Sequence, residues 1–365
     1  MLKLKAFQVL KDPNRNSSVD FFRGIAIICV VIFHFNRFLP LGNLGVDLFF
    51  VISGLLVGGL LTKNLESDKK INFLKFFLQR GFKIWPSFYA FIVFGSLIAF
   101  GFYRNSHPEQ IIPFWDMKRY LFFYQNYTGG PFHWSFDHVW SLCVEEHFYI
   151  LLPILFILIQ TFANKKHKVN VIFISVILTI IAGIFFKFCS YYFTNSKDTY
   201  AGTHNRIDAL AWGVLLNLMV IYCGKILQSS VYKFLSFSLG LLILVGTIYF
   251  TVSFNSVLFG KIYLHSIVPF SFFLMMSGLY YVDFSRFKVI RFIAYYSYNW
   301  YLWHPVFVIF ISTYIKNPIG ALITYLLITF TVAIFFTVMV EEVFLKRRKK
   351  ILSRLFKVQT QQVVT

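Results

Sequence analysis

The sequence predicts an all-α integral membrane protein, a bundle that crosses the bilayer about ten times with both termini in the cytoplasm. Of its 365 residues, 58% are hydrophobic and only 14% are charged, and the mean hydropathy is +0.66. A soluble domain of this size does not need so much apolar surface. The net charge of +20 does not indicate a nucleic-acid partner, because the basic residues form short clusters between apolar runs.

Apolar runs long enough to cross the hydrocarbon core of a bilayer define the predicted spans. They lie at 20–39, 45–62, 84–103, 138–162, 169–193, 205–223, 231–252, 262–281, 292–314 and 319–345. The segment 111–127 is aromatic but interrupted by Asp116, Lys118 and Arg119, so we expect it to lie at the membrane interface or to re-enter it. These runs predict one transmembrane domain over 20–345, between a cytoplasmic segment 1–19 and a basic tail 346–365.

Lysine and arginine placement predicts the orientation of the spans. Most of the 35 basic residues fall in every second connection or in the two terminal segments, and such segments usually lie in the cytoplasm. The tail sequence KRRKKILSRLFK is typical of an amphipathic helix that lies on anionic lipid. The four cysteines form no CxxC pair, so we expect neither a disulfide framework nor a metal site. We therefore expect a multi-pass protein of the plasma membrane.

Ionisable side chains inside the spans are the candidate functional residues, since such groups usually face a partner or a cavity. Following each span in its predicted direction brings five of them to a similar depth in the outer half: His34, Asp47, Glu145, Arg206 and Asp208. One such residue alone would be explained by local pairing. Five together predict a buried polar site, in which Glu145 and Tyr149 share a helix face at positions i and i+4.

A second polar feature is predicted at the cytoplasmic side. Arg23 lies eleven residues before His34 on nearly the same face of one helix, about 16 Å away along its axis. Arg80 and Lys83 are three residues apart, and with Arg23 they form a cationic mouth that suits phosphate groups. The alternative is the ordinary excess of positive charge in a cytoplasmic loop. Asn299 and His304 are candidates to line the same cavity, or to satisfy a local kink at Pro305.

Four sequence blocks resemble the acyltransferase-3 family in order: DFFRGIAIICVVIFH, GVDLFFVISGLLVGG, WSLCVEEHFY and YSYNWYLWHP. The family consists of membrane-bound bacterial O-acyltransferases that modify surface polysaccharides, peptidoglycan, lipid-linked sugars or antibiotics. The resemblance covers about residues 18–345. It implies an acyl-CoA donor, most often acetyl-CoA, that comes from the cytoplasm. It also implies an acceptor hydroxyl on a carbohydrate or glycolipid of the cell envelope.

The resemblance implies roles for individual residues. His34 matches the essential histidine of the family, Arg23 its partner arginine, and Glu145 the glutamate of the SLxxE pattern. Arg80 and Lys83 fall at an R-x-x-R motif whose second arginine is lysine here, which keeps the charge but not the bidentate fork. In the ending YLWHP, proline follows His304 directly, one position earlier than in the family. Many members carry an additional extracellular hydrolase-like domain, and we expect a standalone form here.

The expected mechanism combines these assignments. Arg23, Arg80 and Lys83 hold the phosphates of acyl-CoA, and the thioester reaches into the bundle towards His34. His34 acts as general base on the acceptor hydroxyl or carries the acyl group covalently, and Glu145 orients its imidazole. The candidates for acceptor binding are Asp47, Ser141, Tyr149, Arg206, Asp208, Asn299 and His304.

Two other function classes compete with the enzyme. A transporter or flippase for a glycolipid would explain the intramembrane charges and the break at Pro305, but the sequence has no internal repeat. The other alternative is a structural subunit of a polysaccharide-assembly complex. The sequence leaves the acceptor, the acyl chain and the oligomeric state open.

Overall fold

Helices form the whole regular structure of the described residues. The computed structural model describes residues 6, 10, 12, 15–66, 70–128, 133–164, 166–193, 200–254 and 259–357, and no strand occurs among them. The all-α prediction is therefore confirmed. Five residues that contribute to the orientation prediction lie outside the described residues: Lys3, Lys5, Lys11, Lys69 and Lys165.

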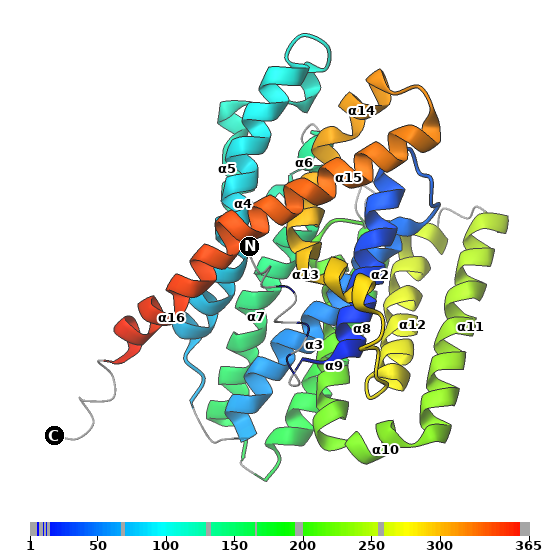
Figure 1. The fold of residues 1–365 in the computed structure, drawn as a ribbon. Coiled ribbons are helices and arrows are strands. Elements are labelled where there is room, and N and C mark those ends of the chain that lie inside the picture. The colour runs from blue at the N-terminus through cyan, green and yellow to red at the C-terminus, as the bar shows by residue number, and fades with distance from the viewer. Residues whose placement is uncertain are drawn as a thin grey trace.

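Each predicted span corresponds to a helix (Figure 1). The main helices are α2 (Ser17–His34), α3 (Gly45–Glu66), α4 (Phe73–Tyr103), α7 (Trp140–Phe162), α8 (Lys168–Phe193), α9 (Ile207–Tyr222), α11 (Ser230–Phe254), α12 (Leu264–Leu279), α13 (Lys288–Trp303), α14 (Val308–Tyr314), α15 (Pro318–Phe336) and α16 (Glu342–Lys357). Seven helical stretches are long and apolar enough to cross a membrane, whereas α9 and α12 are apolar but shorter. The count of ten crossings and the cytoplasmic termini stay predictions.

Short helical elements connect the long ones. They are η1 (Gly42–Leu44), η2 (Pro108–Gln110), η3 (Phe114–Asp116), α5 (Met117–Leu121), η4 (Gln125–Tyr127), α6 (Trp134–Asp137), η5 (Thr203–Asn205), α10 (Gly224–Gln228), η6 (Phe259–Tyr263), η7 (His304–Phe307) and η8 (Thr337–Glu341). In Figure 1, α11 and α12 stand at one side of the bundle, α4 and α5 at the other, and α15 and α16 cross between them.

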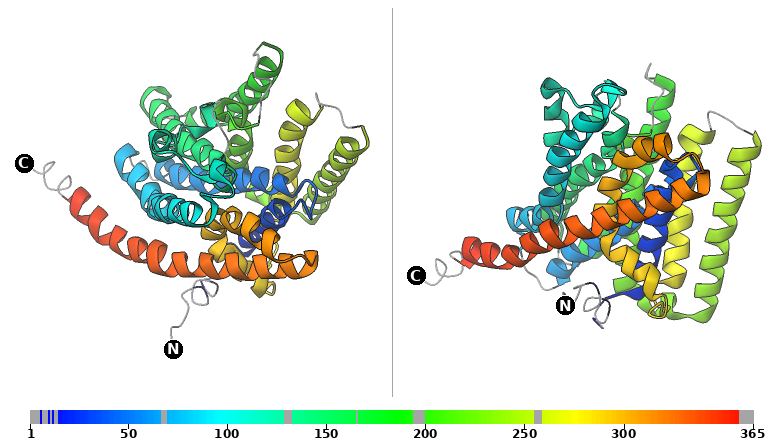
Figure 2. Two further views of the ribbon diagram at one scale, coloured as in Figure 1. Left: turned by 90° about the horizontal axis from the view of Figure 1, so that it is seen from above. Right: turned by 45° about the horizontal axis from the view of Figure 1, so that its top comes forward.

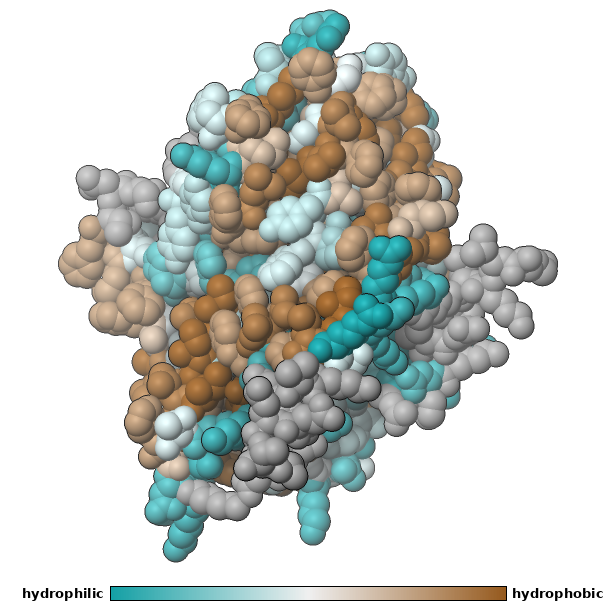
Figure 3. Space-filling model, turned by 90° about the vertical axis from the view of Figure 1, so that its left-hand side faces the viewer, coloured by the Kyte–Doolittle hydropathy of each residue, from teal (hydrophilic) through white to brown (hydrophobic). Residues whose placement is uncertain are grey.

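The bundle presents apolar side chains outwards. Figure 3 shows hydrophobic residues over much of one face, between hydrophilic residues at its upper and lower ends. Large apolar side chains are exposed on several of the long helices, among them Leu97, Leu178, Leu242 and Leu327. The segment 111–127 folds into η3, α5 and η4, and it exposes Phe114 and Trp115. Exposed aromatic residues of this kind agree with the interfacial position expected for that segment.

Helix α4 begins earlier than the predicted span. The prediction started the span at residue 84, but the helix starts at Phe73 because the Asn72 side chain accepts a hydrogen bond from the Lys75 amide at 2.8 Å. The segment with Arg80 and Lys83 is therefore the first part of a long helix. Both side chains are consequently fixed on one helical scaffold.

The predicted kink at Pro305 is present. Helix α13 ends at Trp303, the 3-10 turn η7 contains Pro305, and α14 continues the chain. A proline inside a helix removes one backbone hydrogen bond and clashes with the preceding turn, which explains the break. His304 consequently lies at the end of a helix.

The last helix runs well beyond the predicted span. Helix α15, the π-helical turn η8 and α16 follow one another without a loop, and Figure 2 shows them as one long, gently curved helix. The predicted boundary at residue 346 falls inside α16. Residues 346–357 of the basic segment thus extend the helix that precedes them.

Helices α3 and α9 pack closely through two glycines. A Cβ atom on Gly54 would lie 1.9 Å from the Leu210 carbonyl oxygen, and one on Gly213 would lie 2.0 Å from the Val51 carbonyl oxygen. Small residues at such crossings let two helix backbones approach each other. This contact holds α3, which supplies several side chains of the site described below, in its place in the bundle.

We expect Gly54→Ala to destabilise the protein, because the methyl group forces α3 and α9 apart. Overpacking of this kind costs about 1–3 kcal/mol. The melting temperature of purified protein in detergent measures the effect. Gly246→Ala in α11 is the matched control, since a Cβ there meets open space. Equal melting temperatures for the two variants would contradict the close packing.

Candidate active site

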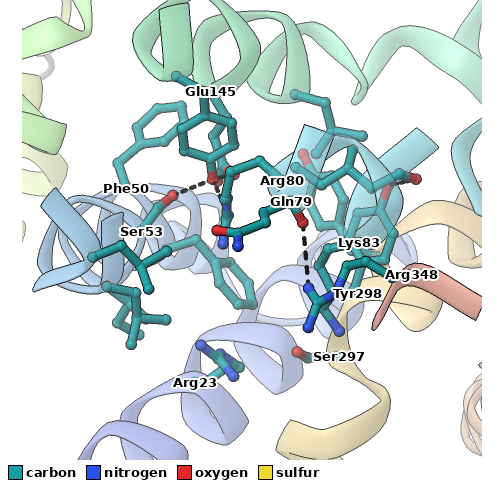
Figure 4. A pocket seen from close by; sticks show the side chains of 18 of the residues that line it. Arg23, Phe50, Ser53, Gln79, Arg80, Lys83, Glu145, Ser297, Tyr298 and Arg348 are labelled. Carbon is teal, nitrogen blue, oxygen red and sulfur yellow. Dashed lines mark hydrogen bonds between the residues drawn. The ribbon is translucent and has the colours of Figure 1, made fainter. Parts of the chain in front are cut away.

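A cavity of about 950 Å³ lies between α2, α3, α4, α7, α13 and α16 (Figure 4). Half of the predicted site residues line it: Arg23, Arg80, Lys83, Ser141, Glu145 and Tyr149. They come from three helices, α2, α4 and α7, so the fold brings them together from distant parts of the sequence. The cavity therefore joins the predicted cationic mouth to the predicted glutamate.

A chain of hydrogen bonds crosses the interior of the cavity. The Tyr149 hydroxyl donates to Glu145 Oε2 at 2.5 Å, which confirms that these two residues share a helix face. Arg80 Nη2 donates to the Tyr149 oxygen at 2.7 Å, and its guanidinium lies 4.4 Å from the centre of the tyrosine ring. Ser53 Oγ lies 2.6 Å from the same oxygen and, since the tyrosine proton is engaged, Ser53 donates. Tyr149 thus links α3, α4 and α7.

The mouth of the cavity is strongly cationic. Among the described residues that line the cavity, Glu145 is the single carboxylate, against seven basic residues: Arg15, Arg23, Lys75, Arg80, Lys83, Arg348 and Lys349. Some of these charges are already paired, because Arg15 bonds Asp20 at 2.5 Å and Lys83 forms an ion pair with Glu341. Arg23 has no hydrogen-bond or ion-pair partner among the described residues. Its guanidinium is therefore available to an anionic ligand.

His34 lies outside the cavity, in a cluster of three imidazoles. The ring centres of His34 and His304 are 4.8 Å apart, and those of His304 and His138 are 5.3 Å apart. His34 ends α2, His304 follows α13, and His138 lies between α6 and α7. Sequence reasoning missed His138, although it stands at the start of a predicted span and at the depth of His34.

Each imidazole of this cluster is held by a backbone carbonyl. His34 Nδ1 lies 2.9 Å from the Val30 oxygen, His304 Nδ1 lies 2.8 Å from the Tyr301 oxygen, and His138 Nε2 lies 3.1 Å from the Leu302 oxygen. A carbonyl only accepts, so these nitrogens carry the protons. The second nitrogen of each neutral ring then offers a lone pair, and those of His138 and His304 are buried without a partner in the described part of the chain.

Tyr301 separates the cavity from the histidine cluster. Its side chain lines the cavity, and its ring centre lies 5.2 Å from that of His138 and 5.7 Å from that of His304. The Tyr301 hydroxyl donates to the His138 carbonyl at 2.7 Å and lies 2.7 Å from Ser141 Oγ. The inner end of the cavity is thus one aromatic ring away from the imidazoles.

Glu145 and His34 are not hydrogen-bonded to each other within the described ranges. Glu145 is engaged by Tyr149 inside the cavity, whereas His34 bonds the Val30 carbonyl. The expectation that Glu145 orients the imidazole therefore has no contact to support it here. The orienting group that the structure provides for His34 is its own helix backbone.

The remaining outer residues form a separate buried network. Arg206 Nη2 bonds Asp47 Oδ1 at 2.5 Å, and Lys187 Nζ bonds Asp208 Oδ2 at 2.5 Å. The His265 ring lies 3.3 Å from the second Asp47 oxygen. This network ties α3, α8, α9 and α12 together, and none of its members lines the cavity. Sequence reasoning missed Lys187 and His265, although both are ionisable residues inside predicted spans.

Asn299 holds the last helix in place. Its Nδ2 donates to Thr337 Oγ1 at 3.0 Å and to Glu341 Oε2 at 2.9 Å. Glu341 also pairs with Lys83, so the three side chains connect α13, η8 and α4. Neither Asn299 nor His304 lines the cavity.

Comparison with known proteins agrees with this geometry. A family model described as an acyltransferase domain, that of acyltransferase-3, matches residues 16–340. The chain belongs to the acyltransferase-3 family. The match covers every main helix that bounds the cavity except α16, all of which lies beyond it. The family assignment therefore extends to Arg23, Arg80 and Glu145, but not to the basic residues of the last helix.

Two relatives of this acyltransferase domain come from Staphylococcus aureus. A protein of strain MSSA476 named "Putative O-acetyltransferase SAS0844" is 28% identical over 91% of this chain and 57% of its own length. The protein named O-acetyltransferase OatA of strain NCTC 8325 is 25% identical over 85% of this chain and 53% of its own length. The chain thus spans a little over half the length of these curated relatives. No solved structure matches it.

We expect Arg206→Ala to destabilise the acyltransferase domain strongly, because it leaves Asp47 as a buried unpaired charge. Breaking a buried ion pair in this way costs about 3–5 kcal/mol. Thermal unfolding in detergent measures the loss, with the exposed Arg286→Ala as control. A variant that melts like the control but loses acceptor binding would instead make Arg206 a binding residue.

Proposed function

We propose that the chain transfers an acetyl group from acetyl-CoA to a hydroxyl of a surface polysaccharide, peptidoglycan or lipid-linked sugar. The observation that carries this proposal is the cavity, which has a cationic mouth and in which Arg23 has no ion-pair partner among the described residues. Its volume of about 950 Å³ is suited to a ligand of cofactor size. Family membership and the names of the relatives support an O-acyl transfer.

The donor enters through the cationic mouth, which we place in the cytoplasm. Arg23 is the main phosphate ligand, because its guanidinium is free and presents a fork of donors. Arg80 and Lys83 add positive charge from the wall, while their hydrogen bonds are engaged by Tyr149 and Glu341. The pantetheine arm then runs inwards, and the thioester arrives beside Ser141 and Tyr301.

His34 supplies the basic group on the other side of Tyr301. With Nδ1–H donated to Val30, the Nε2 lone pair of the imidazole accepts the proton of the acceptor hydroxyl. The hydroxyl oxygen attacks the thioester carbonyl, a C–O bond forms, the C–S bond breaks, and CoA leaves as a thiolate that takes up a proton. In the second form of the mechanism, Nε2 attacks first and His34 carries the acetyl group to the acceptor.

We expect His34→Ala to abolish acetyl transfer while the protein stays folded. The assay uses purified protein, radiolabelled acetyl-CoA and an extract of lipid-linked glycans. His167→Ala is the matched control, because that histidine is exposed in the segment between α7 and α8. Label on the wild-type protein before acceptor is added would identify the covalent form. Unchanged transfer in His34→Ala would contradict the role of His34, and wild-type protein that neither binds nor consumes acetyl-CoA would favour the transporter.

We expect Arg23→Ala to raise the KM for acetyl-CoA by about tenfold or more with a small effect on kcat. A charge-assisted hydrogen bond to phosphate is worth about 1.5–3 kcal/mol, and it is made equally in the ground state and the transition state. Steady-state kinetics of donor consumption measures the change, with Arg286→Ala as control. An unchanged KM for acetyl-CoA would mean that Arg23 does not bind the phosphates of the donor.

A further inference from the structure

The C-terminal helix α16 forms one wall of the cavity mouth. It passes beside the first turns of α4, where Arg348 faces Gln79 (Figure 4). Five of its residues line the cavity: Arg348, Lys349, Leu352, Ser353 and Phe356. Their spacing puts them on one face of a helix, whereas Arg347 and Lys350 lie outside this face and are exposed. The basic segment expected to lie on lipid thus turns a defined face towards the cavity.

Several contacts fix α16 over the mouth. Glu341, the residue directly before α16, is held by Asn299 and Lys83, and Glu342 at its start accepts a hydrogen bond from the Tyr295 hydroxyl at 2.8 Å. Further along, Arg348 Nη1 donates to the Gln79 carbonyl at 3.3 Å. Leu352 is buried. The helix is therefore part of the cavity wall over the length that carries Arg348 and Lys349.

The positive charge on this face of α16 is not neutralised. Arg348 engages a neutral carbonyl with one nitrogen, which leaves the rest of its guanidinium fork available. Lys349 is exposed and has no hydrogen-bond or ion-pair partner among the described residues. Among the described residues that line the cavity, the side chains of Arg23 on α2 and Lys75 on α4 also have no hydrogen-bond or ion-pair partner, and the Lys75 ammonium lies 6.0 Å from the ring centre of Phe356. A cation-lined cleft with apolar walls concentrates anions.

An acyl-CoA carries two separate anionic groups that such a cavity can recognise. The pyrophosphate follows directly after the pantetheine arm, and the 3′-phosphate lies further out on the ribose. Because the arm must point inwards to Ser141 and Tyr301, the pyrophosphate comes nearer to Arg23. The 3′-phosphate then comes nearer to the rim, where α16 lies.

We propose that Arg348 and Lys349 of α16 bind the 3′-phosphate of the acyl-CoA donor, so that the C-terminal helix distinguishes CoA from its 3′-dephospho form. This inference rests on the proposed function. A phosphate at this place could also belong to a lipid headgroup, since α16 continues a membrane helix. The two sources share their chemistry, but only the nucleotide makes donor affinity depend on the 3′-phosphate.

The test compares acetyl-CoA with acetyl-3′-dephospho-CoA in a nonionic detergent, where no anionic lipid is present. For wild-type protein we expect about tenfold weaker binding of the dephospho form. Arg348→Ala/Lys349→Ala should weaken acetyl-CoA binding by a similar factor and remove most of the preference. Arg347→Ala/Lys350→Ala removes the same amount of charge from the same helix, and this variant should keep the preference for acetyl-CoA over the dephospho form. Equal preference in the two double variants, or no preference in the wild type, would overturn the inference.

Two further measurements separate 3′-phosphate binding from misfolding of the variants and from lipid binding. Lys349→Ala alone removes a side chain without a described partner, so it should fold normally and lose part of the preference. Adding phosphatidylglycerol to the micelles should leave the preference unchanged, and binding of this lipid that is lost in Arg348→Ala/Lys349→Ala, together with equal affinity for the two nucleotides, would assign α16 to headgroups. If the wild type binds neither nucleotide, the proposed function itself fails. Binding without 3′-phosphate dependence overturns the α16 inference alone.

Discussion

A charged side chain inside an apolar helix bundle is costly unless another group pairs with it, and this constraint organises the whole molecule. The pairs Asp47–Arg206 and Lys187–Asp208 join buried charges of α3, α8 and α9 and hold these helices together. Tyr149 forms hydrogen bonds with both Arg80 and Glu145, and so it links α4 to α7. Once these groups are satisfied, the groups left unpaired carry meaning. Among the described residues they include Arg23 at the cavity, and Nδ1 of His138 and Nε2 of His304 beside His34.

The arrangement of these unpaired groups divides the candidate site into two compartments. The cavity opens between the cations of α2, α4 and α16, whereas the histidine cluster lies where α2 and α13 end. Tyr301 and Ser141 stand between the two. Under the proposed function, the donor occupies the first compartment and the acceptor hydroxyl approaches the second. An acetyl group would then pass from one to the other inside the protein, so neither polar substrate has to enter the lipid.

The helix positions could be predicted because a bilayer demands long apolar runs, and the pairing of Glu145 with Tyr149 followed from helical spacing. The division of the outer polar residues could not be predicted. Depth along a span says nothing about direction around the bundle axis, and Asp47 therefore faces Arg206 and not Glu145. The position of α16 beside the cavity could not be predicted from the sequence either. A basic amphipathic pattern is the same for a helix that lies on lipid and for one that covers a cavity.

The most direct test of this account is a structure, determined by electron cryomicroscopy, of the protein with an acetyl-CoA analogue in which a methylene separates the carbonyl from the sulfur. The account predicts density for the nucleotide between Arg23 and the face of α16 that carries Arg348, with the arm inside the cavity and the carbonyl beside Tyr301. An analogue bound elsewhere on the bundle, or a cavity without density at saturating concentration, would contradict it.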